Sequence, residues 1–360
     1  MSWHSLHIHY HGDQDRLIVG VVKPLATQWA QGLPGGNGTP VRSYFQRHWR
    51  QGPHVRINVE ADPAAYSQAI RPAVVARAAE FMAACPSTAP ADEERLTPVH
   101  QRLAMEERER GPLSPWVPDN TVTDAGYDDR RHVLGTEQAC RLFADFNVMT
   151  TDLALRMTED AVHTGDRLSS CLDLMVATAQ EFAPRGIAQG AMSMRSHAEW
   201  FLVRSGAAGS LRPRWDDRYR RCAGEVREQV SHVLGATDAG MAAPHVRRWL
   251  ETMRVIHQRA GELADCGLLP LPGVERDPYK PFNSPFHLAL DRNDVWLSEV
   301  RDARWFQQYR LMLNYLYVHF TRLGVRPVER FWLCHLVACA VEERNGVSAM
   351  ERLAATRQAG

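Results

Sequence analysis

Basic, imidazole and amide side chains alternate with apolar ones in residues 44–59, the first stretch of the sequence that offers groups for chemistry. The Gln-Gly-Pro sequence at 51–53 predicts a turn between two short strands. Because side chains of a strand point alternately to opposite faces, His54, Arg56 and Asn58 share one face, and the residues between them are apolar. The pattern predicts a sheet with one face on a core and the other rich in groups that bind anions or amides.

A second polar set lies in residues 305–323, which are otherwise mostly apolar or aromatic and predict a deeply buried helix. Two stripes at helical spacing are polar: Arg310, Asn314 and Tyr317 on one, Tyr315 and His319 on its neighbour. A buried polar group without a hydrogen-bond partner costs about 1–3 kcal/mol, so each of these groups should be paired. The stripes either tie the helix to neighbouring loops or line a reaction site, and the residue pattern leaves both interpretations open.

Residues 193–201 combine a helix-cap pattern with basic groups. Ser196 is followed three residues later by Glu199, the spacing of a capping box. Capping does not account for Arg195 and His197 at the same predicted helix start, and a helix N-terminus attracts anions and carbonyl oxygens. The segment is either a cap alone or a cap that belongs to a site.

Several established active-site patterns are absent from the sequence. It contains no HExxH, GxSxG, Walker, CxxC or Gly-rich dinucleotide-binding motif, and no Lys-Ser/Thr pair follows the Gly-rich residues 32–39. The seven cysteines have no metal-ligand spacing, and His7 and His9 lack a nearby Cys or carboxylate partner. We therefore expect no metal site and a protein poor in cofactors.

The composition is that of an ordinary globular protein. The 360 residues have a formal net charge of +0 and are 44% hydrophobic, which does not predict nucleic acid or a membrane surface as a partner. No apolar run approaches the ~20 residues that cross a bilayer, and the polar N-terminus is unlike a signal peptide. Scattered cysteines are typical of reduced thiols, so we expect a cytoplasmic protein.

The elements that must position the polar groups fall into two parts. A strand at 3–10, a helix at 13–31, the strand pair and a helix at 62–84 have the order of a ferredoxin-like sandwich. A long connection follows, with a predicted helix at 93–110 and a predicted strand at 127–134.

The rest of the chain is predicted to be mainly helical. The expected helices are 137–163, 166–182, 194–205, 214–234, 243–265, 302–323 and 326–344. Residues 286–290 are predicted to add one strand. We expect a single α+β domain, with an α/β part at 1–135 and a mainly helical part at 136–360.

Five short motifs follow one another along the chain, at residues 3–10, 44–49, 52–58, 127–157 and 316–325. Their order resembles that of thiopeptide pyridine synthases, which are distant relatives of the C-terminal glutamate-elimination domain of class I lantibiotic dehydratases. Three more segments resemble the pyridine synthases specifically: 86–88, 115–120 and 192–199. At Tyr317 and Thr321 the eliminase pattern tends to have His and Asn, and this departure disfavours glutamate elimination.

The resemblance implies a fold like that elimination domain and a reaction on a ribosomally made precursor peptide. Such enzymes take a leader-bearing peptide with azoles and two dehydroalanines and join the dehydroalanines in a formal aza-(4+2) cycloaddition. Loss of water and of the leader as an amide then gives the pyridine of a macrocycle. The resemblance implies no cofactor, no nucleic acid and no membrane, and it allows a homodimer.

The resemblance also implies roles for the polar residues. The catalytic candidates, which would hold an amide as its imidic acid and move protons, are Tyr317, His319, Asn314, Tyr315, Ser196 and His197. The substrate-binding candidates are Arg47, His48, His54, Arg56, Arg195 and Arg310. The part at 1–135, with its sheet and the helix at 62–84, would bind the leader and help form the cavity.

Two other functions remain open on the sequence. One is a stand-alone glutamate-elimination protein that uses Arg47 and Arg56 as glutamate clamps and His319 as a base. The other is a non-catalytic partner that binds a peptide at an exposed sheet edge.

Overall fold

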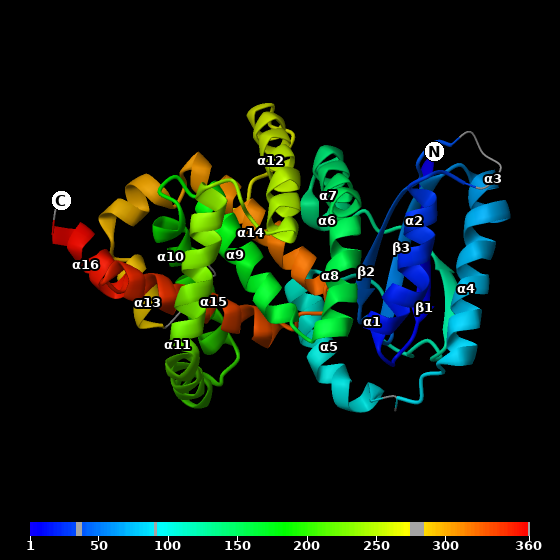
Figure 1. Ribbon diagram of the computed structural model, residues 1–360, viewed down its shortest axis with the longest axis horizontal. Helices are drawn as coiled ribbons and strands as arrows, with labels where there is room; N and C mark the ends of the chain where they lie inside the picture. Colours follow the sequence, from blue (N-terminus) through cyan, green and yellow to red (C-terminus); the bar gives the residue numbers. More distant parts are fainter. Residues whose placement is uncertain (34–37, 90–91, 274–283, 359–360) are drawn as a thin grey trace. The chain divides into compact units, whose positions relative to one another are not determined.

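The structure is a computed structural model that describes residues 1–33, 38–89, 92–273 and 284–358 (Figure 1). Contacts divide the chain into a first unit, residues 1–165 and 321–324, and a second unit, residues 166–320 and 325–360. The first unit contains a small antiparallel sheet, and the described residues of the second unit are mainly helical. The predicted α+β fold is therefore confirmed.

Four strands form the sheet in the order β2-β3-β1-β4. They are β1 (Ser2–His9), β2 (Arg42–His48), β3 (His54–Ala61) and β4 (Thr121–Ala125). The predicted turn between β2 and β3 has positive φ angles at Gln51 (57°) and Gly52 (98°), a conformation that glycine adopts without steric cost.

The strand register brings the polar residues of three strands onto one face. His54 lies opposite both His9 on β1 and His48 on β2, and Arg56 lies opposite His7. The prediction of a polar face is therefore confirmed, and the face is larger than the β2–β3 pair alone.

The other face of the sheet is the core of the first unit, where Ile8, Phe45 and Ile57 are almost fully buried. The helices that cover it are α1 (Gln14–Leu17), the π-helix η1 (Ile18–Val22), α2 (Lys23–Trp29), α3 (Pro63–Ala65), the π-helix η2 (Tyr66–Ile70) and α4 (Arg71–Ala84). The side chains of Asp13 and Asp62 cap α1 and α3 by accepting backbone N–H bonds. Figure 1 shows α1 and α2 lying along the strands.

The helix α5 (Glu93–Glu107) confirms the helix expected in the long connection, but the strand predicted at 127–134 is wrong. The edge strand β4 comes earlier, and Arg131–Leu134 forms the short helix α6. Two aspartates before α6 accept hydrogen bonds from the backbone N–H groups of Arg130 and Arg131. Such local side-chain bonds compete with an extended backbone.

Two helices after the expected boundary at residue 135 belong to the first unit. They are α7 (Glu137–Met149) and α8 (Thr151–Thr164), which contact β2. They replace one predicted helix, and the break falls at Thr150, whose hydroxyl donates to the carbonyl of Phe146. The assignment of leader binding to residues 1–135 stays a prediction.

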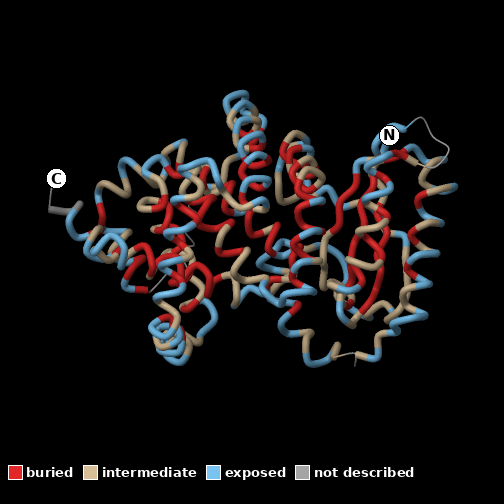
Figure 2. Tube along the Cα trace, viewed as in Figure 1, coloured by how far each residue is buried: buried red, intermediate tan, exposed pale blue. Residues whose placement is uncertain are grey.

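The second unit is built around α9 (Arg167–Phe182), α10 (Ile187–Arg204) and α15 (Pro327–Asn345), which pack on one another. Its other helices are α11 (Ala208–Asp238), α12 (Pro244–Asp265), α13 (Pro285–Leu290), the π-helix η3 (Trp296–Val300), α14 (Arg304–Arg322, whose last two residues are grouped with the first unit) and α16 (Ala349–Gln358). Figure 2 shows the buried positions of this unit concentrated along its central helices.

Two predictions about the second unit are wrong. The helix that was expected to start at 194 begins at Ile187, so Ser196 lies inside α10 and is not an N-cap. Residues 286–290 lie in α13 and not in a strand, because the Ser284 hydroxyl caps this helix by accepting the N–H of His287 at 3.1 Å.

Parts of the Gly-rich segment 32–39, and of residues 268–293 between the helices predicted at 243–265 and 302–323, lie outside the described residues. Among the helices of the described part, none is long and apolar enough to cross a membrane.

Candidate functional site

A hydrogen bond between two aromatic side chains marks the centre of the second unit. The Tyr317 hydroxyl on α14 lies 2.6 Å from Nδ1 of His197 on α10. Burial raises the pKa of Tyr317 well above its usual value, and burial together with the charges of Arg310 and Arg330 lowers the pKa of His197 to about 3. Both groups are therefore neutral, with the phenol as proton donor and the imidazole as acceptor.

Two further groups lie against Tyr317, and the sequence analysis missed both. Cys334 Sγ lies 3.3 Å from the hydroxyl oxygen, and the Arg330 guanidinium lies 4.8 Å from the ring centroid of Tyr317. A cation over the ring favours the developing negative charge of a phenol that gives up a proton. Both residues lie on α15, for which the sequence predicted only a helix at 326–344.

A second series of hydrogen-bonded side chains starts at Ser196, one residue before His197. The Ser196 hydroxyl lies 3.0 Å from Nε2 of His287, and Nδ1 of the same ring lies 2.7 Å from the Ser284 hydroxyl. Burial lowers the pKa of His287, so the ring is neutral and can pass a proton between its two nitrogens and the two serines. His287 and Ser284 were missed because 286–290 was taken for a strand. The available signal was Ser-Pro-Phe-His, a cap followed by proline at the first helical position.

The polar face of the sheet in the first unit is buried. Its rings pack closely: centroids of His7 and His54 are 4.7 Å apart, those of His9 and His54 are 4.8 Å apart, and those of His48 and His54 are 5.3 Å apart. Burial is the main reason that the pKa falls to about 2 for His7 and about 4 for both His9 and His48. The four imidazoles are therefore neutral near pH 7, since the pKa of His54 is also lowered well below its usual value.

Arg56 supplies the positive charge of that face. It is 6% exposed, its Nε donates to His54 at 3.2 Å, and its Nη2 has no hydrogen-bond partner among the described residues. Burial lowers the pKa of Arg56 to about 10, which still leaves it charged at neutral pH. The unpaired N–H group can donate to a carbonyl or carboxylate oxygen.

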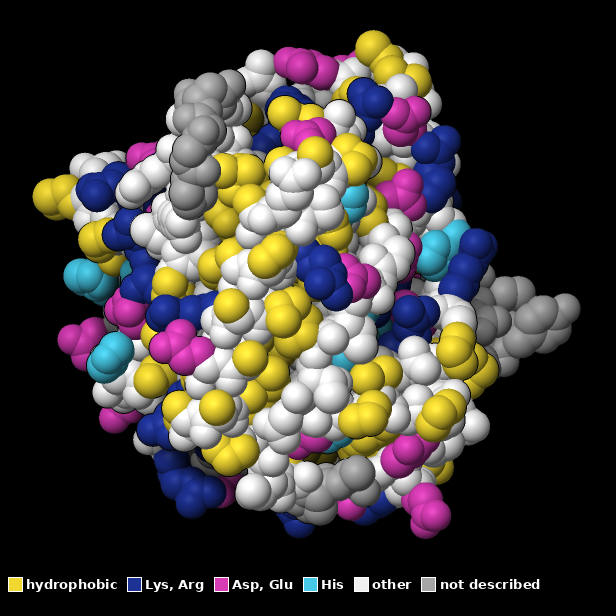
Figure 3. All heavy atoms as spheres, turned by 90° about the vertical axis from the view of Figure 1, so that its right-hand side faces the viewer, with side chains coloured by type: hydrophobic (Ala, Val, Ile, Leu, Met, Phe, Trp, Pro, Cys, Tyr) yellow, Lys and Arg dark blue, Asp and Glu magenta, His cyan; other side chains and the backbone are white. Residues whose placement is uncertain are grey.

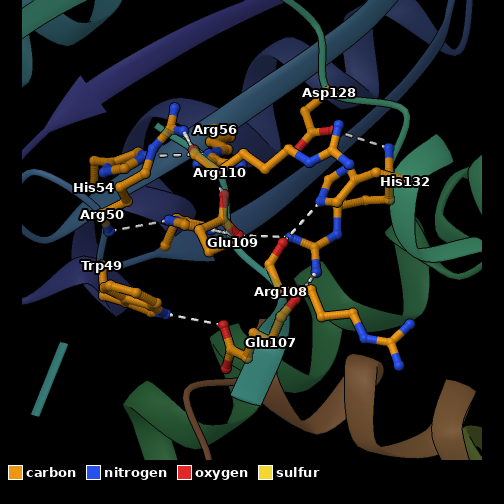
Figure 4. A network of polar contacts seen from close by, with 12 residues as sticks. Trp49, Arg50, His54, Arg56, Glu107, Arg108, Glu109, Arg110, Asp128 and His132 are labelled. Atoms are coloured by element: carbon orange, nitrogen blue, oxygen red, sulfur yellow. Dashed lines mark hydrogen bonds and ion pairs between the residues drawn. The ribbon is translucent and has the colours of Figure 1, made fainter. Parts of the chain in front are cut away.

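Glu109 is the buried anion near this face, and Figure 4 shows the network around it. Its carboxylate accepts from Arg130 at 2.5 Å and lies 3.4 Å from His48 and 3.9 Å from Arg50. Burial alone would raise the pKa of Glu109, but the bond from His48 and the charge of Arg130 lower it to about 2. No pattern in the sequence points to this residue, which lies within the charged run at 106–110.

Comparison with known proteins identifies the family of this chain. The model of the C-terminal domain of lantibiotic biosynthesis dehydratases matches residues 3–341. The chain belongs to this lantibiotic dehydratase C-terminal family. No protein of curated function matches it significantly.

Solved structures related to this member of the lantibiotic dehydratase C-terminal family include two that cover it almost entirely. The pyridine synthase TbtD from thiomuracin biosynthesis is 33% identical over 96% of this chain and 99% of its own, with a TM-score of 0.78. TsrL is 20% identical over 99% of this chain and 98% of its own, with a TM-score of 0.70, and shares the fold. The resemblance to pyridine synthases stated from the sequence is therefore confirmed.

The structure separates the catalytic candidates of this family member into four sets. Tyr317 and His197 pair with each other, and Ser196 pairs with His287. Tyr315 and His319 are buried on the opposite side of α14, where the His319 ring lies 5.0 Å from the ring of Trp249. Asn314 is exposed, which corrects the expectation that its stripe is buried throughout.

Three of the arginine candidates already have partners. Arg195 Nε donates to Glu342 at 2.8 Å, and Arg310 lies 5.9 Å from the ring centroid of Phe306. Arg47 pairs with Asp15, and its Nε donates to the carbonyl of Arg322 at 2.8 Å. Since Arg47 lies opposite Val55 in the register, it points to the apolar side of the sheet, away from Arg56. The expected helix N-terminal site at Arg195 is wrong, because this residue lies inside α10.

Proposed function

We propose that this protein is a thiopeptide pyridine synthase that acts on a leader-bearing, azole-containing precursor peptide in the cytoplasm. The observation that carries the proposal is the 33% identity to the pyridine synthase TbtD across nearly the whole of both chains. Membership of the lantibiotic dehydratase C-terminal family supports a role in peptide maturation. A homodimer stays a prediction.

The proposed reaction joins two dehydroalanines. One dehydroalanine amide becomes its imidic acid, so that C=C–N=C(OH) forms a four-atom unit, and two carbon–carbon bonds form between its ends and the second alkene. Two eliminations follow, each taking a proton from the new ring. One releases the hydroxyl as water and the other releases the leader as a carboxamide. Holding the two alkenes together supplies up to about 7–11 kcal/mol of the barrier.

The neutral pairs of the second unit suit the proton transfers of this reaction. In the proposal, the Tyr317 hydroxyl, oriented by Nδ1 of His197, protonates the departing hydroxyl group, and the proton that the new ring loses in the same elimination restores the phenol. The Ser196–His287–Ser284 chain assists the departure of the leader amide by delivering a proton to its nitrogen. The proposal keeps Asn314, Tyr315, His319, Arg195 and Arg310 as further candidates for contacts with the peptide.

The first unit is proposed to bind the leader. Strand β4 is an edge of the sheet among the described strands, so an extended peptide can add to it. Figure 3 shows hydrophobic side chains spread over the middle of the face on this side of the unit, broken by a few charged groups. On α4, Ala76, Ala79 and Ala83 are exposed. We expect Arg56, His48 and His54 to contact peptide carbonyls, and removal of the leader to weaken binding far more than changes in the core.

One assay tests the proposed function and its alternatives: mass spectrometry of a dehydrated, azole-bearing precursor peptide after incubation with the protein. Cyclisation with loss of water and of the leader as an amide supports the pyridine synthase. Loss of glutamate from a glutamylated peptide would instead identify an eliminase. An unchanged mass with tight binding would identify a non-catalytic peptide-binding partner.

A further inference from the structure

The second unit has a surface cavity of about 490 Å³, within the roughly 300–1,000 Å³ typical of small-molecule sites. The end of α9, the loop to α10, α12 and the start of α14 surround it, with these side chains on its lining: Gln180, Glu181, Phe182, His257, Trp305 and Gln308. On α14, Gln308 precedes Tyr317 by nine residues, about two and a half turns at 3.6 residues per turn. The cavity therefore lies on the other side of α14 from the Tyr317–His197 pair.

Aromatic rings form the apolar walls of the cavity. The ring centroids of Phe182 and His257 are 5.1 Å apart with an interplanar angle of 35°, and Trp305 contributes a third ring. Flat walls of this kind stack against a planar ring and select against a puckered aliphatic one.

Polar atoms in the cavity have unused hydrogen-bonding capacity. The side chains of His257, Trp305 and Gln308 make no hydrogen bond to any residue in the described part of the chain. Burial lowers the pKa of His257, so this ring offers one donor and one acceptor. Together with the indole N–H and the side-chain amide, the cavity can pair with both the N–H and the C=O of a ligand amide.

The charges around the cavity disfavour an anionic ligand. Among the described residues, no lysine or arginine lines it, and Glu181 carries a carboxylate that Arg254 holds at 2.6 and 2.9 Å. The C-terminal end of α9, with its partial negative charge, also lies here. The surroundings therefore favour a neutral ligand with N–H donors.

The loop between α9 and α10 holds the cavity in shape. Gln180 Oε1 accepts the backbone N–H of Ile187 at 3.0 Å, and its Nε2 donates to Asp238 at 3.2 Å. Gly186 has a φ of 60°, and a Cβ at this position would lie 2.6 Å from Gln180 Oε1. The cavity is thus preformed, which reduces the ordering cost of binding.

We propose that this cavity binds a planar heteroaromatic ring that carries an amide, as in the azole segments of the precursor peptide. The identification of the ligand as substrate rests on the proposed function. The binding of such a ring does not, because it follows from the walls, the unused donors and acceptors, and the charge of the cavity.

The first test uses 2-methylthiazole-4-carboxamide as the probe and measures its dissociation constant by ligand-observed NMR titration. We expect saturable binding that is about threefold to tenfold weaker in Gln308→Ala and weaker again in Trp305→Ala. Gln307→Ala is the matched control, since this neighbour on α14 does not line the cavity. Binding that is equally strong for cyclopentanecarboxamide, or unchanged in both cavity variants, overturns the proposal.

The second test asks whether the bound ring is part of the substrate. It measures binding and does not depend on turnover. The affinity of an azole-bearing precursor peptide is compared with that of the same peptide carrying the unmodified residues. A preference for the azole peptide that disappears in Gln308→Ala supports the substrate assignment. Probe binding without such a preference overturns that assignment, whereas absence of cyclisation in the mass assay overturns the proposed function alone.

Discussion

The buried polar groups of the two units are satisfied in different ways. In the first unit, the Glu109 carboxylate is held by Arg130 and lies beside a face of neutral imidazoles. At the candidate site of the second unit, around Tyr317, neutral groups pair with one another, as Tyr317 does with His197. Ion pairs fix geometry at a high desolvation cost, whereas neutral O–H···N bonds transfer a proton with little change of charge. The difference favours recognition of the peptide by the first unit and proton transfer by the Tyr317–His197 pair of the second.

The largest effect is expected for Tyr317→Phe. The ring stays, so the free energy of unfolding should fall by only about 1 kcal/mol for one lost hydrogen bond. Turnover should fall ~10²–10⁴-fold if the hydroxyl acts in the transition state. Single-turnover rate and melting temperature are measured on the same preparation.

The control for Tyr317→Phe is Tyr309→Phe on the same helix. The Tyr309 hydroxyl is buried and donates to the carbonyl of Gly190 at 3.1 Å, so this variant should lose comparable stability and keep its turnover. If Tyr317→Phe lost stability and stayed fully active, the residue would be part of the core only, and the contrast between the units would disappear.

The next largest effect is expected for Glu109→Gln. The substitution keeps the shape but leaves the charges of Arg130 and Arg50 without their carboxylate, so the free energy of unfolding should fall by roughly 2–4 kcal/mol. Urea denaturation measures the change. The matched control is Glu107→Gln, whose exposed side chain accepts from Trp49 Nε1 at 3.1 Å and can still do so as an amide. Equal, small losses in both variants would contradict a buried ion network.

A smaller effect on stability is expected when the pH is lowered. The pKa of His7 is about 2 in the fold and near its ordinary value when unfolded, so the unfolded chain binds the extra proton below about pH 6.5. Stability should therefore fall on acidification from pH 6.5 towards pH 4, by up to about 1.4 kcal/mol per pH unit for each such histidine. Urea midpoints at several pH values should show a shallower slope for His7→Gln than for the wild type. An identical slope would mean that His7 does not carry this linkage.

Local patterns in the sequence predicted the sheet well. The alternation around His54 and Arg56 gave both the strand and its polar face, because side-chain direction in a strand depends on position alone. The same pattern could not predict that Arg47 and Arg56 face opposite sides of the sheet with different partners. That outcome depends on the register of β2 against β3.

The candidate site of the second unit was predicted only in part. His197 and Tyr317 were found because each stood out on its own helix, but their pairing joins residues 120 positions apart. His287 pairs with Ser196 across 91 positions and carries no periodic signal. The start of α10 was misplaced because the capping-box spacing of Ser196 and Glu199 was taken for a helix start, whereas α10 begins at Ile187 and includes Gly190. In the structure a Cβ at Gly190 would lie 2.8 Å from the Tyr309 hydroxyl, so close packing explains the glycine.

The smallest effect is expected for metal ions at the histidine face of the first unit, which is the part of the molecule most like a metal site. Zinc needs ligand nitrogens about 2.0–2.1 Å from one point. The rings of His7 and His54 instead stack at 4.7 Å with an interplanar angle of 20°, and the charged Arg56 beside them repels a cation. Among the described residues, no group of three His, Cys, Asp or Glu side chains is arranged to hold a metal ion.

A chelator should therefore leave both turnover and melting temperature unchanged, and added zinc should not raise the melting temperature. Activity that is lost with chelator, restored by zinc and absent in His54→Gln would show that the face binds a metal ion and would reverse the assignment of recognition to this unit.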